Sequence, residues 1–136
     1  AWSYARLASA AAAGESAPAA VVSAMTGHPE LTSSPGREPL RIMRAGAGRL
    51  LAKEGAEGVL CVAAVDRDWG LALKVVDGGR RAVGPAAVAV LVRAGLLAED
   101  ERLALSRLAT VPIEGTTGER VGEFRGVVDG AGGEVR

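Results

Sequence analysis

The chain has 136 residues and a formal net charge of zero at pH 7, which fits one domain or part of a larger one and argues against a nucleic-acid or anionic-membrane surface, since such surfaces need a basic patch. Its one cysteine excludes an intrachain disulfide and fits a cytoplasmic location. No apolar stretch reaches the roughly 20 residues that span a bilayer, so we expect no membrane segment.

The first third of the chain predicts helices. Alanine-rich and valine-containing runs that end at glycine are typical of helices, because glycine adopts the left-handed conformation that closes them. A residue before proline is pushed out of the helical region, which predicts a turn at His28. We therefore expect helices over 2–13, 16–27 and 40–47, a turn or extended segment over 28–31, and a loop over 32–39.

The middle of the chain predicts strands and the end predicts mostly helices. Unbroken apolar runs are typical of strands that are covered on both faces. We expect strands over 50–53, 59–65 and 69–76, helices over 85–94 and 99–108, a loop over 112–119, a strand over 121–128 and a frayed tail over 130–136. This order predicts an α+β fold in which helices flank an antiparallel sheet. Cys61 lies in the most apolar run, so we expect a buried, inert thiol on a central strand.

The segment from Lys53 to Gly58 is the strongest candidate for a functional site. The only lysines of the chain are Lys53 and Lys74. Lysine can lose its proton when desolvated, whereas arginine stays protonated, so lysine suits proton transfer. Gly55 allows a substrate to approach the backbone closely. A strand-end lysine that faces water is the competing interpretation for Lys53, and for Lys74 the two interpretations stay open.

Other site classes are not supported by the sequence. The chain lacks the glycine patterns of nucleotide-binding loops and the Gly-x-Ser-x-Gly turn of many hydrolases. Cys61 and His28 alone are too few ligands for a metal site. We therefore expect no metal site in these residues.

Longer motifs resemble one family. Residues 44–58 end in Lys-Glu-Gly-Ala-Glu-Gly, residues 70–78 read Gly-x-Ala-x-Lys-x-x-Asp-Gly, and Arg81-Ala82 follow before a predicted helix. The set resembles the C-terminal half of the bacterial L-asparaginase II family, the thermolabile Rhizobium-type enzymes. The segments His28-Pro29-Glu30 and Val121-Gly122-Glu123 also fit the pattern.

The resemblance implies a fold related to serine β-lactamases and glutaminases. In such enzymes a Ser-x-x-Lys pair supplies the nucleophile and its base, and a Lys-x-Gly strand lines the site. Lys53 is then the expected catalytic residue, and Gly55, Ala56 and Glu57 are expected to shape the pocket for L-asparagine. The resemblance further implies a homodimer of the complete protein, and zinc only through residues that are absent from this chain.

No serine of the chain is followed by lysine three residues later. We therefore expect residues 1–136 to be the C-terminal portion of an asparaginase-like domain whose N-terminal half is absent, and to be inactive alone. The alternative is a truncated or degenerate chain that serves as a folding or interaction unit without catalysis. A Ser-x-x-Lys pair encoded upstream would separate the two.

Overall fold

The computed structural model describes residues 1–129; the predicted frayed tail lies outside them. The helices are α1 (Trp2–Ala12), α2 (Ser16–Gly27), the 3-10 helix η1 (Pro29–Leu31), α3 (Glu38–Ala45), the 3-10 helix η2 (Arg80–Ala82), α4 (Val83–Arg93), α5 (Glu99–Ala104) and α6 (Ser106–Ala109). The strands are β1 (Leu50–Gly55), β2 (Val59–Ala64), β3 (Trp69–Lys74), β4 (Thr110–Glu114) and β5 (Arg120–Arg125). The α+β class and the antiparallel sheet with flanking helices are confirmed.

The main sheet has three antiparallel strands in the order β1-β2-β3, so β2 is central and β1 lies at an edge. In the register, Lys53 of β1 faces Cys61 of β2, which faces Ala72 of β3. Residues that face each other across a ladder point to the same side of a sheet. These three side chains therefore lie on one face, and their neighbours in sequence point to the other.

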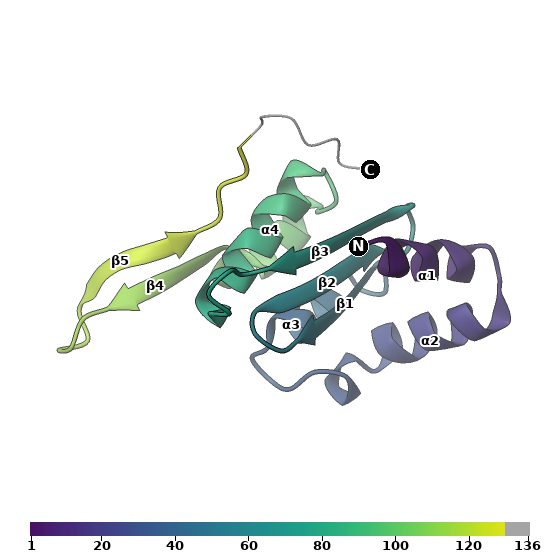
Figure 1. Cartoon of the computed structure of the whole chain (residues 1–136), viewed down its shortest axis with the longest axis horizontal. Coiled ribbons are helices and arrows are strands. Elements are labelled where there is room, and N and C mark those ends of the chain that lie inside the picture. Colours follow the sequence, from purple (N-terminus) through teal and green to yellow (C-terminus); the bar gives the residue numbers. More distant parts are fainter. Residues whose placement is uncertain (130–136) are drawn as a thin grey trace.

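Helices cover both faces of this sheet (Figure 1). On one face, α1 presses so closely on β3 that a Cβ added to Gly70 would lie 2.8 Å from the Ala1 carbonyl oxygen. The helix α2 packs beside α1 and contacts β1. On the other face lie α3, which contacts β1, and α4, which contacts β2 and β3. The core is aliphatic: Leu50, Leu51, Leu60 and Val62 are fully buried between the layers.

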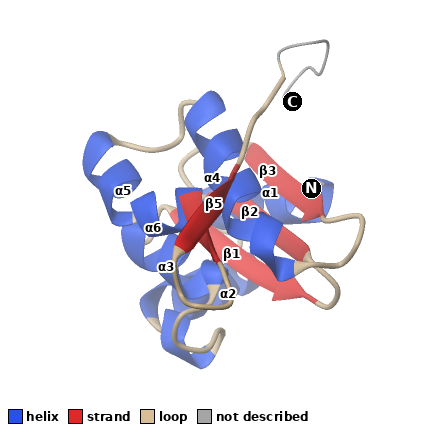
Figure 2. Cartoon of the chain, turned by 90° about the vertical axis from the view of Figure 1, so that its left-hand side faces the viewer, coloured by secondary structure: helices blue, strands red, loops and turns tan. Residues whose placement is uncertain are grey.

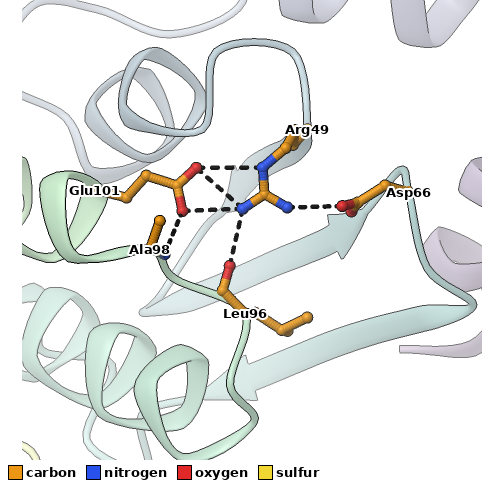
Figure 3. A network of polar contacts seen from close by, with 5 residues as sticks. All are labelled: Arg49, Asp66, Leu96, Ala98 and Glu101. Carbon is orange, nitrogen blue, oxygen red and sulfur yellow. Dashed lines mark hydrogen bonds and ion pairs between the residues drawn. The ribbon is translucent and has the colours of Figure 1, made fainter.

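A polar network ties the start of β1 to the C-terminal helices (Figure 3). The Arg49 guanidinium donates to both carboxylate oxygens of Glu101 and to the Leu96 carbonyl, and it pairs with Asp66 at 2.7 Å. The hydrogen bonds that Arg49 donates to Asp66 and then to Glu101 raise the pKa of Arg49 above its ordinary value. Glu101, which is almost fully buried, also accepts the Ala98 backbone N–H. Each charged group of the network is thus paired, and the buried Glu101 carboxylate has the partners that a buried charge requires.

A second hairpin, β4–β5, stands apart from the main sheet (Figure 1), and in the view of Figure 2 it lies in front of that sheet. The predicted loop over 112–119 is therefore wrong in its first part, because Thr110–Glu114 forms strand β4. Pro112 suggested a break in regular structure, but proline is compatible with a strand that has a free edge. Val111 and Ile113 alternate with polar residues, which is the pattern of a half-buried strand. The predicted late strand is confirmed as β5.

Two helical predictions also need correction. The predicted helix over 99–108 is divided into α5 and α6 at Leu105, a residue that is buried in the core. Pro39 lies in the first turn of α3, where a missing N–H costs nothing, so the helix begins at Glu38 inside the predicted loop. Pro29–Leu31 forms a short 3-10 helix where a turn or extended segment was expected. Within residues 1–129 no helix is long and apolar enough to cross a bilayer.

Candidate functional site at the turn end of the sheet

The turn between β1 and β2 has an unusual backbone. Gly55 of β1 faces Val59 of β2, so the turn consists of residues 56–58. Glu57 and Gly58 both have positive φ, 56° and 71°, and for glutamate this conformation is strained. A Cβ on Gly58 would lie 3.0 Å from the Val75 Cβ and 3.1 Å from the Gly78 carbonyl carbon. Only glycine therefore fits at position 58 without displacing its neighbours.

Strand β3 holds this turn from one side. The Lys74 ammonium donates a hydrogen bond to the Glu57 carbonyl oxygen, and the Val75 N–H donates to the Gly58 carbonyl oxygen at 2.9 Å. These bonds satisfy two turn carbonyls that the β1–β2 ladder leaves open. Lys74, whose role the sequence left open, thus contacts the turn through a backbone atom.

Lys53 lies on the α1 face of the sheet, where the cover by α1 runs out. Along that face of β1, Leu51 is buried, Lys53 is half-buried and Gly55 is exposed. The Lys53 Nζ lies 3.4 Å from the Glu54 carbonyl oxygen. The Val65 N–H donates to the Arg49 carbonyl, so the backbone groups of Arg49 point toward β2. Because this direction alternates along a strand, the Glu54 carbonyl points away from β2, toward the edge of β1 that no described strand pairs. The amine thus sits at an accessible edge of the sheet.

Cys61 is the cross-strand neighbour of Lys53. The strand is central, as predicted, but the prediction of a buried thiol is wrong: Cys61 is half-buried. On the same face of β2, Val59 is also half-buried and Ala63 is fully buried. Tyr4 of α1 lies close by: its burial, and then its electrostatic interaction with Cys61, raise the pKa of Tyr4 above its ordinary value.

Glu54 points to the opposite face and anchors a charged cluster. Its Oε2 accepts hydrogen bonds from the Arg37 Nε at 2.7 Å and pairs with Arg37 Nη2 at 2.6 Å. The Arg80 Nη2 lies 4.0 Å from the same oxygen and 2.6 Å from Oε2 of Glu38. Ser33 Oγ completes the contacts of Glu54 at 3.5 Å. The cluster therefore joins β1 to the start of α3 and to η2.

A pocket of about 100 Å³ lies between this cluster and the turn. Its lining includes the three residues predicted to shape a pocket, namely Gly55, Ala56 and Glu57, together with Arg37, Glu38, Glu54, Gly58, Val59, Arg80 and Val83. The structure thus brings these predicted residues together. It places Lys53 outside the lining, on the other face of the strand, so an amine and a pocket flank the same edge from two sides.

The sequence analysis missed the charged partners in this lining. Glu54 was seen only as part of the lysine–glycine motif, and Arg37 and Arg80 were not singled out. One signal was available: neighbouring residues of a strand point to opposite faces. The pair Lys53-Glu54 therefore places one charge on each face of the sheet, and a charged side chain that is partly buried needs a partner of opposite charge.

The described residues do not fit a zinc site. Within residues 1–129, no three side chains of His, Cys, Asp or Glu come together in a group able to hold a metal ion. Cys61 and His28, the one cysteine and the one histidine of the chain, lie on β2 and at the end of α2. No chemical step is therefore assigned to a metal in this part of the protein.

The chain matches the model of a known protein family. Residues 1–126 match the family model described as L-asparaginase II. The match covers α1 to β5, and so includes the turn end of the sheet with Lys53 and the pocket residues. No curated protein matches the chain.

Proposed function

The chain belongs to the L-asparaginase II family, and from that membership we propose that it forms part of an amidohydrolase that converts L-asparagine and water to L-aspartate and ammonia. The family match over residues 1–126 is the observation that carries this proposal. The convergence of Gly55, Ala56 and Glu57 on one small pocket supports a substrate site at the turn end of the sheet, and Lys53 lies on the opposite face of the same strand end. The β-lactamase-like fold, the homodimer and the cytoplasmic location stay predictions.

The proposed chemistry is acyl transfer through a serine ester. A serine hydroxyl attacks the side-chain amide carbon, the C–N bond breaks, and ammonia leaves once its nitrogen has gained a proton. Water then attacks the ester, which releases aspartate and returns the proton to the serine. The nucleophilic serine and its lysine lie outside residues 1–136, since the sequence holds no Ser-x-x-Lys pair.

Two roles are proposed for Lys53 in this reaction. As a cation close to the catalytic lysine, it lowers the affinity of that lysine for a proton and so keeps it ready to act as a base. Alternatively, its ammonium binds the α-carboxylate of the substrate. Gly55, Ala56 and Glu57 shape the adjoining pocket in either case. Residues 1–136 alone should release no ammonia from asparagine, because they lack the Ser-x-x-Lys pair that supplies the nucleophile and its base.

The test is ammonia release by the full-length protein with L-asparagine and, in parallel, L-glutamine. Lys53→Ala should lower turnover at least about a hundredfold, the lower end of the range for a positioned proton-transfer group. Lys74→Ala is the matched control and should change turnover only severalfold, because Lys74 contacts a backbone carbonyl. Unchanged turnover in Lys53→Ala contradicts the role of Lys53. A full-length protein that hydrolyses neither amide contradicts the amidohydrolase itself and favours the non-catalytic alternative.

A further inference from the structure

Glu54 and Lys53 are joined by one peptide bond and point to opposite faces of the sheet. The Lys53 amine rests 3.4 Å from the Glu54 carbonyl oxygen. Any force that fixes the Glu54 side chain therefore also fixes the backbone that carries Lys53. The charged cluster on the far face supplies such a force.

The end of β1 needs a second anchor. Within the described residues, β1 pairs with β2 on one side only, so Lys53 lies on an edge strand three positions before the turn begins at Ala56. Strand ends that are held on one side open locally at low free energy. Two nitrogen atoms of Arg37 contact one carboxylate oxygen of Glu54, and Arg37 directly precedes α3 as its N-cap residue.

The charges of the cluster balance among themselves. Arg37 pairs with Glu54 at 2.6 Å, and Arg80 pairs with Glu38 at 2.6 Å while it approaches Glu54 at 4.0 Å. Each carboxylate thus has an arginine, and neither arginine is left over for an anionic ligand. This arrangement suits a clamp between segments better than a binding site for an ion.

We propose that Glu54, held by Arg37, is a positioning residue for Lys53: it fixes the end of the edge strand so that the amine stays where the reaction needs it. The inference rests on the proposed function of Lys53. In the full-length protein, Glu54→Gln should lower kcat about tenfold, less than the roughly hundredfold that a displacement of 1 Å can cost. Arg37→Gln should cause the same loss while leaving the sequence of β1 intact.

A Lys53→Ala background separates positioning from general damage to the fold. If Glu54 acts through Lys53, then Glu54→Gln should change the residual kcat of Lys53→Ala by less than about twofold, because effects of residues that act as a unit do not add. A variant that merely reduces the folded fraction would lower both backgrounds equally. Glu99→Gln is the matched control, since Glu99 pairs with Arg102 at 3.3 Å on the exposed face of α5.

The outcomes are distinguishable. A tenfold loss that disappears in the Lys53→Ala background supports the inference. An equal loss in both backgrounds overturns it, and so does normal turnover of both Glu54→Gln and Arg37→Gln when Lys53→Ala is impaired; the proposed function survives these results. Normal turnover of Lys53→Ala overturns the proposed role of Lys53 and, with it, the positioning role of Glu54, but leaves the amidohydrolase itself standing; a full-length protein that hydrolyses neither amide overturns the proposed function.

Discussion

Each end of β1 is anchored by an arginine–glutamate ion pair, and the two ends differ in how deeply that pair is buried. At the start, Arg49 pairs with Glu101 of α5; at the end, Glu54 pairs with Arg37 before α3. Each pair joins the strand to an element distant in sequence. At the start the carboxylate is 8% exposed and the neighbouring leucines are fully buried.

The turn end is more open. The Glu54 carboxylate is 17% exposed, a pocket adjoins it, and the turn itself contains a strained glutamate and a glycine that no other residue can replace freely. Stability in proteins is not uniform, and sites that bind or react are drawn from regions that a rigid scaffold positions. The comparison teaches that the start of β1 supplies the scaffold and its end supplies the candidate site.

The largest effect on stability is expected at the start of the strand. Glu101→Ala removes the buried partner of Arg49 and leaves its guanidinium without that carboxylate, so it should lower the free energy of unfolding by about 2 to 3 kcal/mol. Glu99→Ala, at the exposed pair on the same helix, should cost less than about 0.5 kcal/mol. Denaturant unfolding of both variants checks this; equal costs would show that the start of β1 is not the more strongly anchored end.

A smaller effect is expected at the turn. Gly58→Ala forces a Cβ into positive φ and against Val75 and Gly78, which should cost about 2 kcal/mol. Gly14→Ala is the matched control: Gly14 also has positive φ, but nothing lies within 4 Å of an added Cβ. It should cost about 1 kcal/mol, the backbone strain alone. If the two variants are equally stable in thermal unfolding, the close packing of the turn has no energetic weight.

The smallest effect concerns acid stability near the turn. The Gly79 N–H and then Arg81 hold the pKa of Asp77 below its usual range. A carboxyl whose pKa is lower in the folded state adds stability above its unfolded pKa of about 3.9, and loses it as pH falls through the lower folded pKa. Asp77→Asn should therefore unfold with a shallower loss of stability below about pH 5 than the parent protein. Identical slopes across that range would contradict a lowered pKa of Asp77 in the folded protein.

Much of the fold could be predicted because the pattern of the sequence is local. The apolar runs over 59–65 and 69–76 predicted the two strands that pair as β2 and β3, and glycines marked the ends of the first helices. β4 was missed because Pro112 usually breaks a strand, and only the pairing with β5 shows that its missing N–H is tolerated. The break at Leu105 depends on its burial in the core, which no local pattern reveals.

The candidate site could be predicted only in part. The lysine–glycine motif indicated the right segment, and three of its residues do line one pocket. The partners of Glu54 come from residues 17 and 26 positions away along the chain, Arg37 and Arg80, so their convergence depends on tertiary structure. The exposure of Cys61 likewise depends on how far α1 extends over the sheet.

Steady-state ammonia release by full-length Lys53→Arg, beside the unmodified protein and Lys53→Ala, tests the central claim most directly. Arginine keeps the positive charge but carries it on a larger, planar group, so the position and geometry of the charge change. If the Lys53 amine acts at one fixed position, Lys53→Arg should lose turnover nearly as completely as Lys53→Ala, at least about a hundredfold. Normal turnover in Lys53→Arg would show that a charge anywhere near this edge is enough, and would contradict a positioned lysine at the turn end of β1.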